Sequence, residues 1–130
     1  MITSIGQVML YVNDLEASAK FWTEQAGFEK AIPFPSADGD GSTIYELKPK
    51  ADSDVSFVLQ DKKKIEKMHP ELNLGTPSIM LQTDDLEQTY QFFIEHGVKA
   101  NPIMEATGMR FFNFPDNEGN YFAIKEISAE

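Results

Sequence analysis

The sequence contains no cysteine among its 130 residues, which excludes disulfide bonds and thiolate chemistry. Such a composition is typical of cytoplasmic proteins, and we expect a cytoplasmic location. Basic residues are scarce as well, since 11 Lys and Arg stand against 21 Asp and Glu, for a formal net charge of −10. Because contacts to phosphate groups require clustered basic side chains, we expect no nucleic-acid partner.

Long apolar runs are also missing. No segment approaches the roughly 18 consecutive apolar residues of a membrane-spanning helix, so we expect no membrane partner. The first five residues lack a basic stretch followed by an apolar one, so no signal peptide is expected. A hydrophobic content of 42% is nevertheless sufficient for a globular core.

The chain does contain an internal repeat. Residues 7–16 (QVMLYVNDLE) return in outline as residues 78–87 (SIMLQTDDLE), at an offset of 71 residues, 78 minus 7. A repeat of half the chain predicts two copies of one supersecondary unit that must stack to bury their apolar faces. Each copy is followed by an aromatic pair and then a glycine: Phe21-Trp22 with Gly27, and Phe92-Phe93 with Gly97.

The periodicity of each copy predicts the order strand, helix, strand, strand, strand. Alternation over residues 7–12 is typical of a strand, and Asp14 and Asp85 are typical helix N-caps. Further strands are expected at 29–34, 42–47 and 55–60, then at 99–103, 109–114 and 120–127, with a turn at 37–41. We therefore predict a single α+β domain of two tandem βαβββ modules: 1–60 and 77–130, joined by a helix and linker at 61–76.

Three features in register resemble the vicinal oxygen chelate superfamily, which includes glyoxalases, bleomycin-resistance proteins and extradiol dioxygenases. They are the two Asp-Leu-Glu openings, the glycines after the aromatic helices, and residues 114–123 (FPDNEGNYFA) before the last strand. The resemblance implies two modules whose sheets curve into a cleft, with helices outside. It also implies a homodimer and a small-molecule ligand.

The resemblance further implies four possible metal-ligand positions. They fall on Gln7, Ser78, Ala123 and one residue within 55–59, and of these only Gln7 is a plausible ligand. His69 and His96 are expected at the surface, and Glu46 faces either the cleft or solvent. We therefore expect no metal cofactor, with a divalent metal held by other ligands as the alternative.

Strand alternation assigns a mixed polar and apolar face to the cleft. For strands 42–47 and 109–114, alternation does not fix the register, so it does not decide which residues face the cleft. The sequence predicts a metal-free protein that binds a small aromatic or amphiphilic molecule between the modules. The alternatives are a metal-dependent lyase or dioxygenase, and a dimeric scaffold in which the same side chains fill a core. The predicted cleft lining is Gln7, Met9, Tyr11, Tyr45, Ser78, Met80, Gln82, Phe112, Tyr121 and Ala123.

Overall fold

The computed structural model describes residues 1–36 and 41–127 of the chain. The fold divides into two compact units, Met1–Thr76 and Pro77–Glu130. The turn predicted at 37–41 lies almost entirely outside the described residues. Within the described ranges, no helix is both long and apolar enough to cross a membrane.

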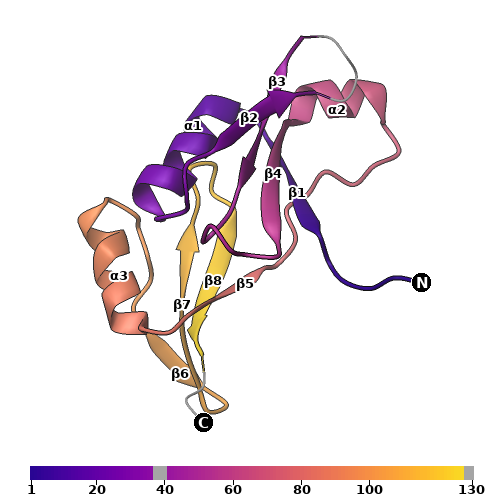
Figure 1. Cartoon of the computed structure of the whole chain (residues 1–130). Coiled ribbons are helices and arrows are strands. Elements are labelled where there is room, and N and C mark those ends of the chain that lie inside the picture. Colours follow the sequence, from indigo (N-terminus) through magenta and orange to yellow (C-terminus); the bar gives the residue numbers. More distant parts are fainter. Residues whose placement is uncertain (37–40, 128–130) are drawn as a thin grey trace. The chain divides into compact units, whose positions relative to one another are not determined.

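The first unit is a four-stranded mixed sheet with helices (Figure 1). The strand order is β1-β4-β3-β2; β1 runs parallel to β4, and the other pairs are antiparallel. Helix α1 continues as a π-helical turn, η1. Its elements are β1 (Gln7–Val12), α1 (Leu15–Lys20), η1 (Phe21–Gln25), β2 (Ile32–Pro35), β3 (Thr43–Leu47), β4 (Ser56–Asp61) and α2 (Lys62–Met68).

Helix α1 packs on one face of this sheet. The Asp14 side chain caps the helix by accepting a hydrogen bond from the Ala17 backbone N at 3.0 Å. Trp22 is fully buried, and its ring lies 5.0 Å from that of Phe28 and 5.3 Å from that of Phe57 on β4. This aromatic cluster anchors the helix to β4. The opposite face of the sheet is therefore not covered by α1.

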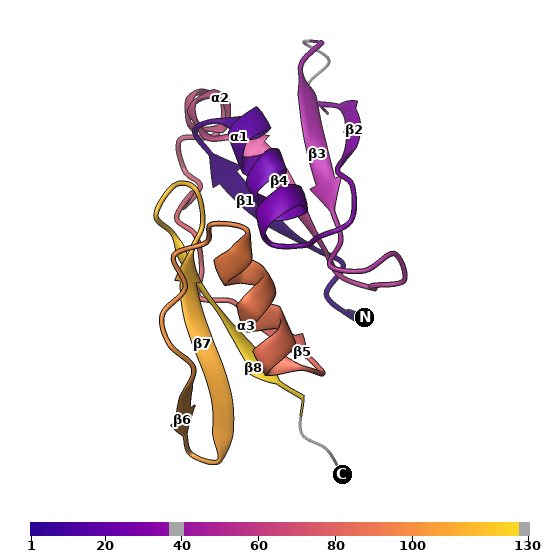
Figure 2. The ribbon, with the colours of Figure 1, turned by 90° about the vertical axis from the view of Figure 1, so that its left-hand side faces the viewer.

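The second unit repeats the topology of the first. Its strand order is β5-β8-β7-β6, with β5 parallel to β8 and the other pairs antiparallel. Helix α3 lies along one face of the sheet, in contact with β7 and β8 (Figure 2). The predicted α+β fold of two tandem βαβββ modules is confirmed. The elements are β5 (Met80–Thr83), α3 (Leu86–Glu95), β6 (Met104–Ala106), β7 (Met109–Pro115) and β8 (Tyr121–Glu126).

One predicted strand is misplaced. Residues 99–103 are not a strand, and the edge strand β6 begins only at Met104. Pro102 lacks the N–H that a sheet ladder needs, and the backbone N of Asn101 makes a single bond to the Asn113 O at 2.9 Å. The pairing with β7 therefore starts only after the proline.

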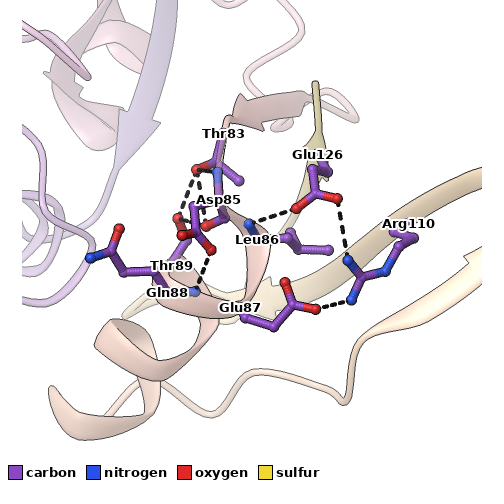
Figure 3. Close-up of polar contacts among 8 residues, drawn as sticks. All are labelled: Thr83, Asp85, Leu86, Glu87, Gln88, Thr89, Arg110 and Glu126. Carbon is purple, nitrogen blue, oxygen red and sulfur yellow. Dashed lines mark hydrogen bonds and ion pairs between the residues drawn. The ribbon is translucent and has the colours of Figure 1, made fainter. Parts of the chain in front are cut away.

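A polar network fixes the N-terminus of α3 to the sheet (Figure 3). The Asp85 side chain accepts from the Gln88 backbone N at 3.0 Å, as a helix N-cap does. The Glu126 carboxylate accepts from the Leu86 N at 3.0 Å and from Arg110 at 3.2 Å, and Arg110 also donates to Glu87. The network therefore ties the first turn of α3 to β7 and β8.

The contact between Arg110 and Glu87 makes stability depend on pH. The hydrogen bond from Arg110 lowers the pKa of the Glu87 carboxyl below its ordinary value. Because the folded pKa is the lower one, the stabilisation is complete above the unfolded value of about 4.3 and is lost as the pH falls through the folded value. We expect Glu87→Gln to be less stable than the wild type at pH 7, and this difference to shrink below about pH 5.

Urea unfolding midpoints measured between pH 7 and pH 3 test this expectation. Glu29→Gln is the control, because it removes the same charge from an exposed residue of the other unit. A stability difference between wild type and Glu87→Gln that stays constant across this range would contradict the assigned ion pair.

Candidate ligand-binding groove

The sheet face opposite α1 carries a continuous set of paired side chains. Across β1 and β4, Met9 pairs with Val58. Val58 of β4 also pairs with Glu46 of β3. Since paired residues of adjacent strands lie on the same face, these rows form one surface. The other pairs on this surface are Gln7 with Ser56, Tyr11 with Gln60, and Ile44 with Phe34.

Helix α2 turns this surface into a groove. It begins directly after β4, and the Asp61 side chain caps it by accepting from the backbone N atoms of Lys63 and Lys64 at 3.0 and 3.3 Å. The Lys64 ammonium also donates to the Ser36 hydroxyl at 3.1 Å, which ties the helix to the far edge of the sheet. The groove has a volume of about 390 Å³, within the range of small-molecule sites.

The lining of the groove combines apolar and polar side chains. Met9 and Val58 lie on its floor, and the Gln60 amide donates to the Met9 sulfur at 3.3 Å. No residue of α2 is fully buried, so its apolar side chains keep surface available to the groove. The lining consists of Gln7, Met9, Tyr11, Phe34, Ser36, Ile44, Val58, Gln60, Ile65, Met68, His69 and Leu72.

A carboxylate is fixed beside Gln7. Oε2 of Glu46 accepts from the Ser56 hydroxyl at 2.7 Å and from the Gln7 amide at 3.1 Å. The hydrogen bond from Ser56 has the larger effect and that from Gln7 the smaller, and together they lower the pKa of the Glu46 carboxyl. Partial desolvation acts in the opposite direction and does not cancel this effect. Glu46 is therefore ionised at neutral pH. The Glu46 side chain lies on the sheet face opposite α1, beside the groove.

Three of the predicted cleft residues lie together in this groove: Gln7, Met9 and Tyr11. Tyr45 does not, and its assignment to the cleft face is corrected. Its hydroxyl donates to the Glu16 carboxylate of α1 at 2.5 Å, so the side chain lies on the helix-covered face. Alternation along β3 therefore places Ile44 and Glu46 on the open face instead.

The prediction that Phe112 lines the cleft is also wrong. It is fully buried, and its ring lies 5.2 Å from Tyr90 and 5.6 Å from Phe93, both on α3. Phe112 is therefore part of the helix-covered core of the second unit. Because β7 alternates, its neighbours Phe111 and Asn113 occupy the opposite face.

The remaining predicted residues belong to the second unit. Met80 and Ala123 are paired across β5 and β8, and Met80 is 43% exposed. Tyr121 lies on β8 and Gln82 on β5, both exposed, whereas Ser78 precedes β5. Their role in binding a ligand stays a prediction.

Helix α2 and the turn after it contribute lining residues that the sequence did not predict. Ile65 and Met68 of α2, and Leu72 after it, line the groove, whereas residues 61–76 were expected only to connect the modules. Ile65 and Met68 are three residues apart, which is a spacing of one helix face, and this signal was present in the sequence.

Comparison with known proteins identifies the family. Residues 4–124 match the family model of the Glyoxalase/Bleomycin resistance protein/Dioxygenase superfamily, and the chain belongs to this superfamily. The predicted resemblance is thus confirmed. The chain is 32% identical over 131 residues to Uncharacterized protein YetH of Bacillus subtilis (strain 168). The alignment covers 97% of this chain and 100% of that protein.

Solved structures share the fold. A glyoxalase/bleomycin resistance protein from Streptomyces sp. CB03234 is 25% identical, with a TM-score of 0.73 and coverage of 94% of this chain and 99% of that one. TnmS3, described as an antibiotic binding protein from the same Streptomyces strain, is 24% identical. Its TM-score is 0.76, with coverage of 98% of both chains.

The residues at the implied metal positions fit a divalent ion poorly. Ser56 occupies the β4 position opposite Gln7, and its hydroxyl already donates to Glu46. Ala123 has no ligand atom in its side chain, while Ser78 offers only a neutral hydroxyl. Among the described residues, no group of three or more His, Cys, Asp or Glu side chains is placed to hold a metal.

Proposed function

We propose that this protein binds a small aromatic or amphiphilic molecule without a metal, and that the groove between the first sheet and α2 forms the site. The observation that carries the proposal is the groove itself, with its volume of about 390 Å³. Membership of a superfamily whose name includes the bleomycin-resistance proteins supports a binding role. The likeness in fold to an antibiotic binding protein agrees with this role.

The lining favours a flat ligand with a large apolar surface. Met9 lines the groove and is 39% exposed, and Ile44 and Phe34 are only half-buried. Covering such side chains with a ligand removes apolar surface from water, at about 25 cal/mol per Å². The thioether of Met9 adapts to the edges of aromatic rings, which suits a binding surface.

A neutral fluorescent probe, N-pentyl dansylamide, tests the groove. We expect its emission to rise saturably on addition of the protein, as the dansyl ring leaves water. Met9→Ala removes an exposed apolar side chain from the groove lining, so it should weaken binding about tenfold, equivalent to about 1.4 kcal/mol. Circular dichroism spectra and unfolding midpoints of each variant separate loss of binding from loss of folding.

Met80→Ala is the matched control, because Met80 holds the equivalent position in the second copy of the repeat. Unchanged affinity in Met80→Ala, with reduced affinity in Met9→Ala, supports a site within the first unit. Equal losses in both variants would instead support the predicted cleft between the modules. Absence of saturable binding to the wild type would overturn the proposed function.

Elemental analysis tests the metal-free part of the proposal. We expect no stoichiometric Zn, Ni, Mn or Fe after extensive dialysis of the purified protein, since the implied ligand positions offer few donors. A retained metal, lost on Gln7→Ala, would favour the metal-dependent alternative. The homodimer and the cytoplasmic location are parts of the same proposal, and sedimentation at micromolar concentration tests the dimer.

A further inference from the structure

The Glu46 carboxylate beside the groove accepts hydrogen bonds at only one of its two oxygens in the described part of the chain. Both hydrogen bonds, from Ser56 and from Gln7, go to Oε2 of Glu46. Within the described part of the chain, Oε1 accepts no hydrogen bond, and no ion pair to Glu46 is found. Lys48 influences Glu46 only through its charge at a distance. A carboxylate can accept about four hydrogen bonds, so Glu46, which accepts two, retains about half of its capacity.

The position of Glu46 makes this oxygen relevant to the groove. Glu46 pairs across the strands with Val58 on the groove floor, and it lies two residues from Ile44 on the same face. Gln7, one of the two side chains that hold it, itself lines the groove. Glu46 is not itself a lining residue, but its hydrogen bond to Gln7 holds a negative charge directly beside the lining.

We propose that Glu46 selects ligands that carry an ammonium, amidinium or guanidinium group beside their apolar body. This inference rests on the proposed function, and it adds the charge of the ligand to it. Ser56 is 3% exposed, so its hydroxyl is a buried support that holds the carboxylate in place before a ligand arrives. A charge fixed in advance loses little conformational freedom on binding, and a hydrogen bond between two charged groups is stronger than a neutral one.

Three dansyl probes that differ in their end group test this proposal. Dansylcadaverine ends in an ammonium, N-pentyl dansylamide ends in a methyl group, and dansyl-6-aminohexanoate ends in a carboxylate. We expect the wild type to bind the ammonium probe about tenfold more tightly than the neutral one, and the carboxylate probe most weakly. The negative net charge of the whole chain contributes to this order, so a variant is needed to locate the effect.

Glu46→Gln keeps the shape of the side chain and an oxygen that can accept from Ser56, but it removes the charge. We expect the preference for the ammonium probe to fall to about threefold or less, while affinity for the neutral probe stays unchanged and reports an intact groove. Glu29→Gln changes the net charge equally at an exposed site elsewhere in the first unit, and should retain the wild-type preference.

The outcomes separate this inference from the proposed function. Binding of the neutral probe with no preference for the ammonium, or with a preference that survives in Glu46→Gln, overturns the role of Glu46 and leaves the groove as a binding site. Equal loss of preference in Glu46→Gln and Glu29→Gln assigns the effect to net charge and also overturns that role. Failure of every probe to bind overturns both.

Discussion

Phe112→Ala is expected to lower the free energy of unfolding by about 3–5 kcal/mol, because it empties the centre of a packed aromatic cluster. Phe112 is fully buried, and rings of α3 and β7 surround it. A loss of this size is a large share of the 5–15 kcal/mol that typically stabilises a domain. Urea unfolding monitored by circular dichroism measures it directly.

Phe111→Ala is the matched control on the neighbouring residue. Phe111 is only half-buried and lies on the opposite face of β7, so its loss should cost about 1 kcal/mol. A large cost for Phe111→Ala together with a small one for Phe112→Ala would contradict the observed register of β7. Folded Phe112→Ala protein should still bind the neutral dansyl probe with unchanged affinity, since the residue lies outside the groove.

The fold was predictable because the repeat, the helix caps and the strand alternation agree with one another. Asp14 and Asp85 cap their helices as the sequence predicts. On β1 the phase of the alternation was also clear, because Leu10 and Val12 form a purely aliphatic face while Met9 and Tyr11 form a mixed one. Both aliphatic residues are indeed buried.

The phase of β3 and β7 was not predictable from alternation. In β3 the adjacent residues Ile44 and Tyr45 are both apolar in character, and in β7 the residues Phe111, Phe112 and Phe114 occupy both faces. With large apolar side chains in both phases, only tertiary packing decides which ones meet the helix. The two corrected residues, Tyr45 and Phe112, come from these two strands.

The groove could not be predicted because it depends on contacts between distant segments. The Glu46 carboxylate bonds to Gln7, 39 residues earlier, and to Ser56, 10 residues later. These contacts follow from the parallel pairing of β1 and β4, which brings Gln7 opposite Ser56. Helix α2 likewise becomes a groove wall only once it lies against this sheet, and its own sequence indicates an apolar face without indicating its partner.

Ile44→Trp is expected to weaken binding of the neutral dansyl probe about a hundredfold, because the indole occupies the space that the ligand needs. Ile44 is half-buried in the groove lining, so the larger side chain extends into the groove, whose volume is about 390 Å³. Isoleucine and tryptophan both favour β-strands, and the unfolding midpoint of Ile44→Trp should therefore change little. A hundredfold loss corresponds to about 2.7 kcal/mol, comparable to burial of one large apolar side chain.

Ile94→Trp makes the same chemical change in the second unit. Ile94 lies on α3, is 43% exposed and is not among the groove residues, so this variant should keep the wild-type affinity. Fluorescence titrations of the two variants with N-pentyl dansylamide compare them directly. If both variants bind like the wild type, the probe occupies another site, and the groove is then a packing feature between α2 and the sheet. If only Ile44→Trp loses affinity, the groove beneath α2 is where the molecule binds.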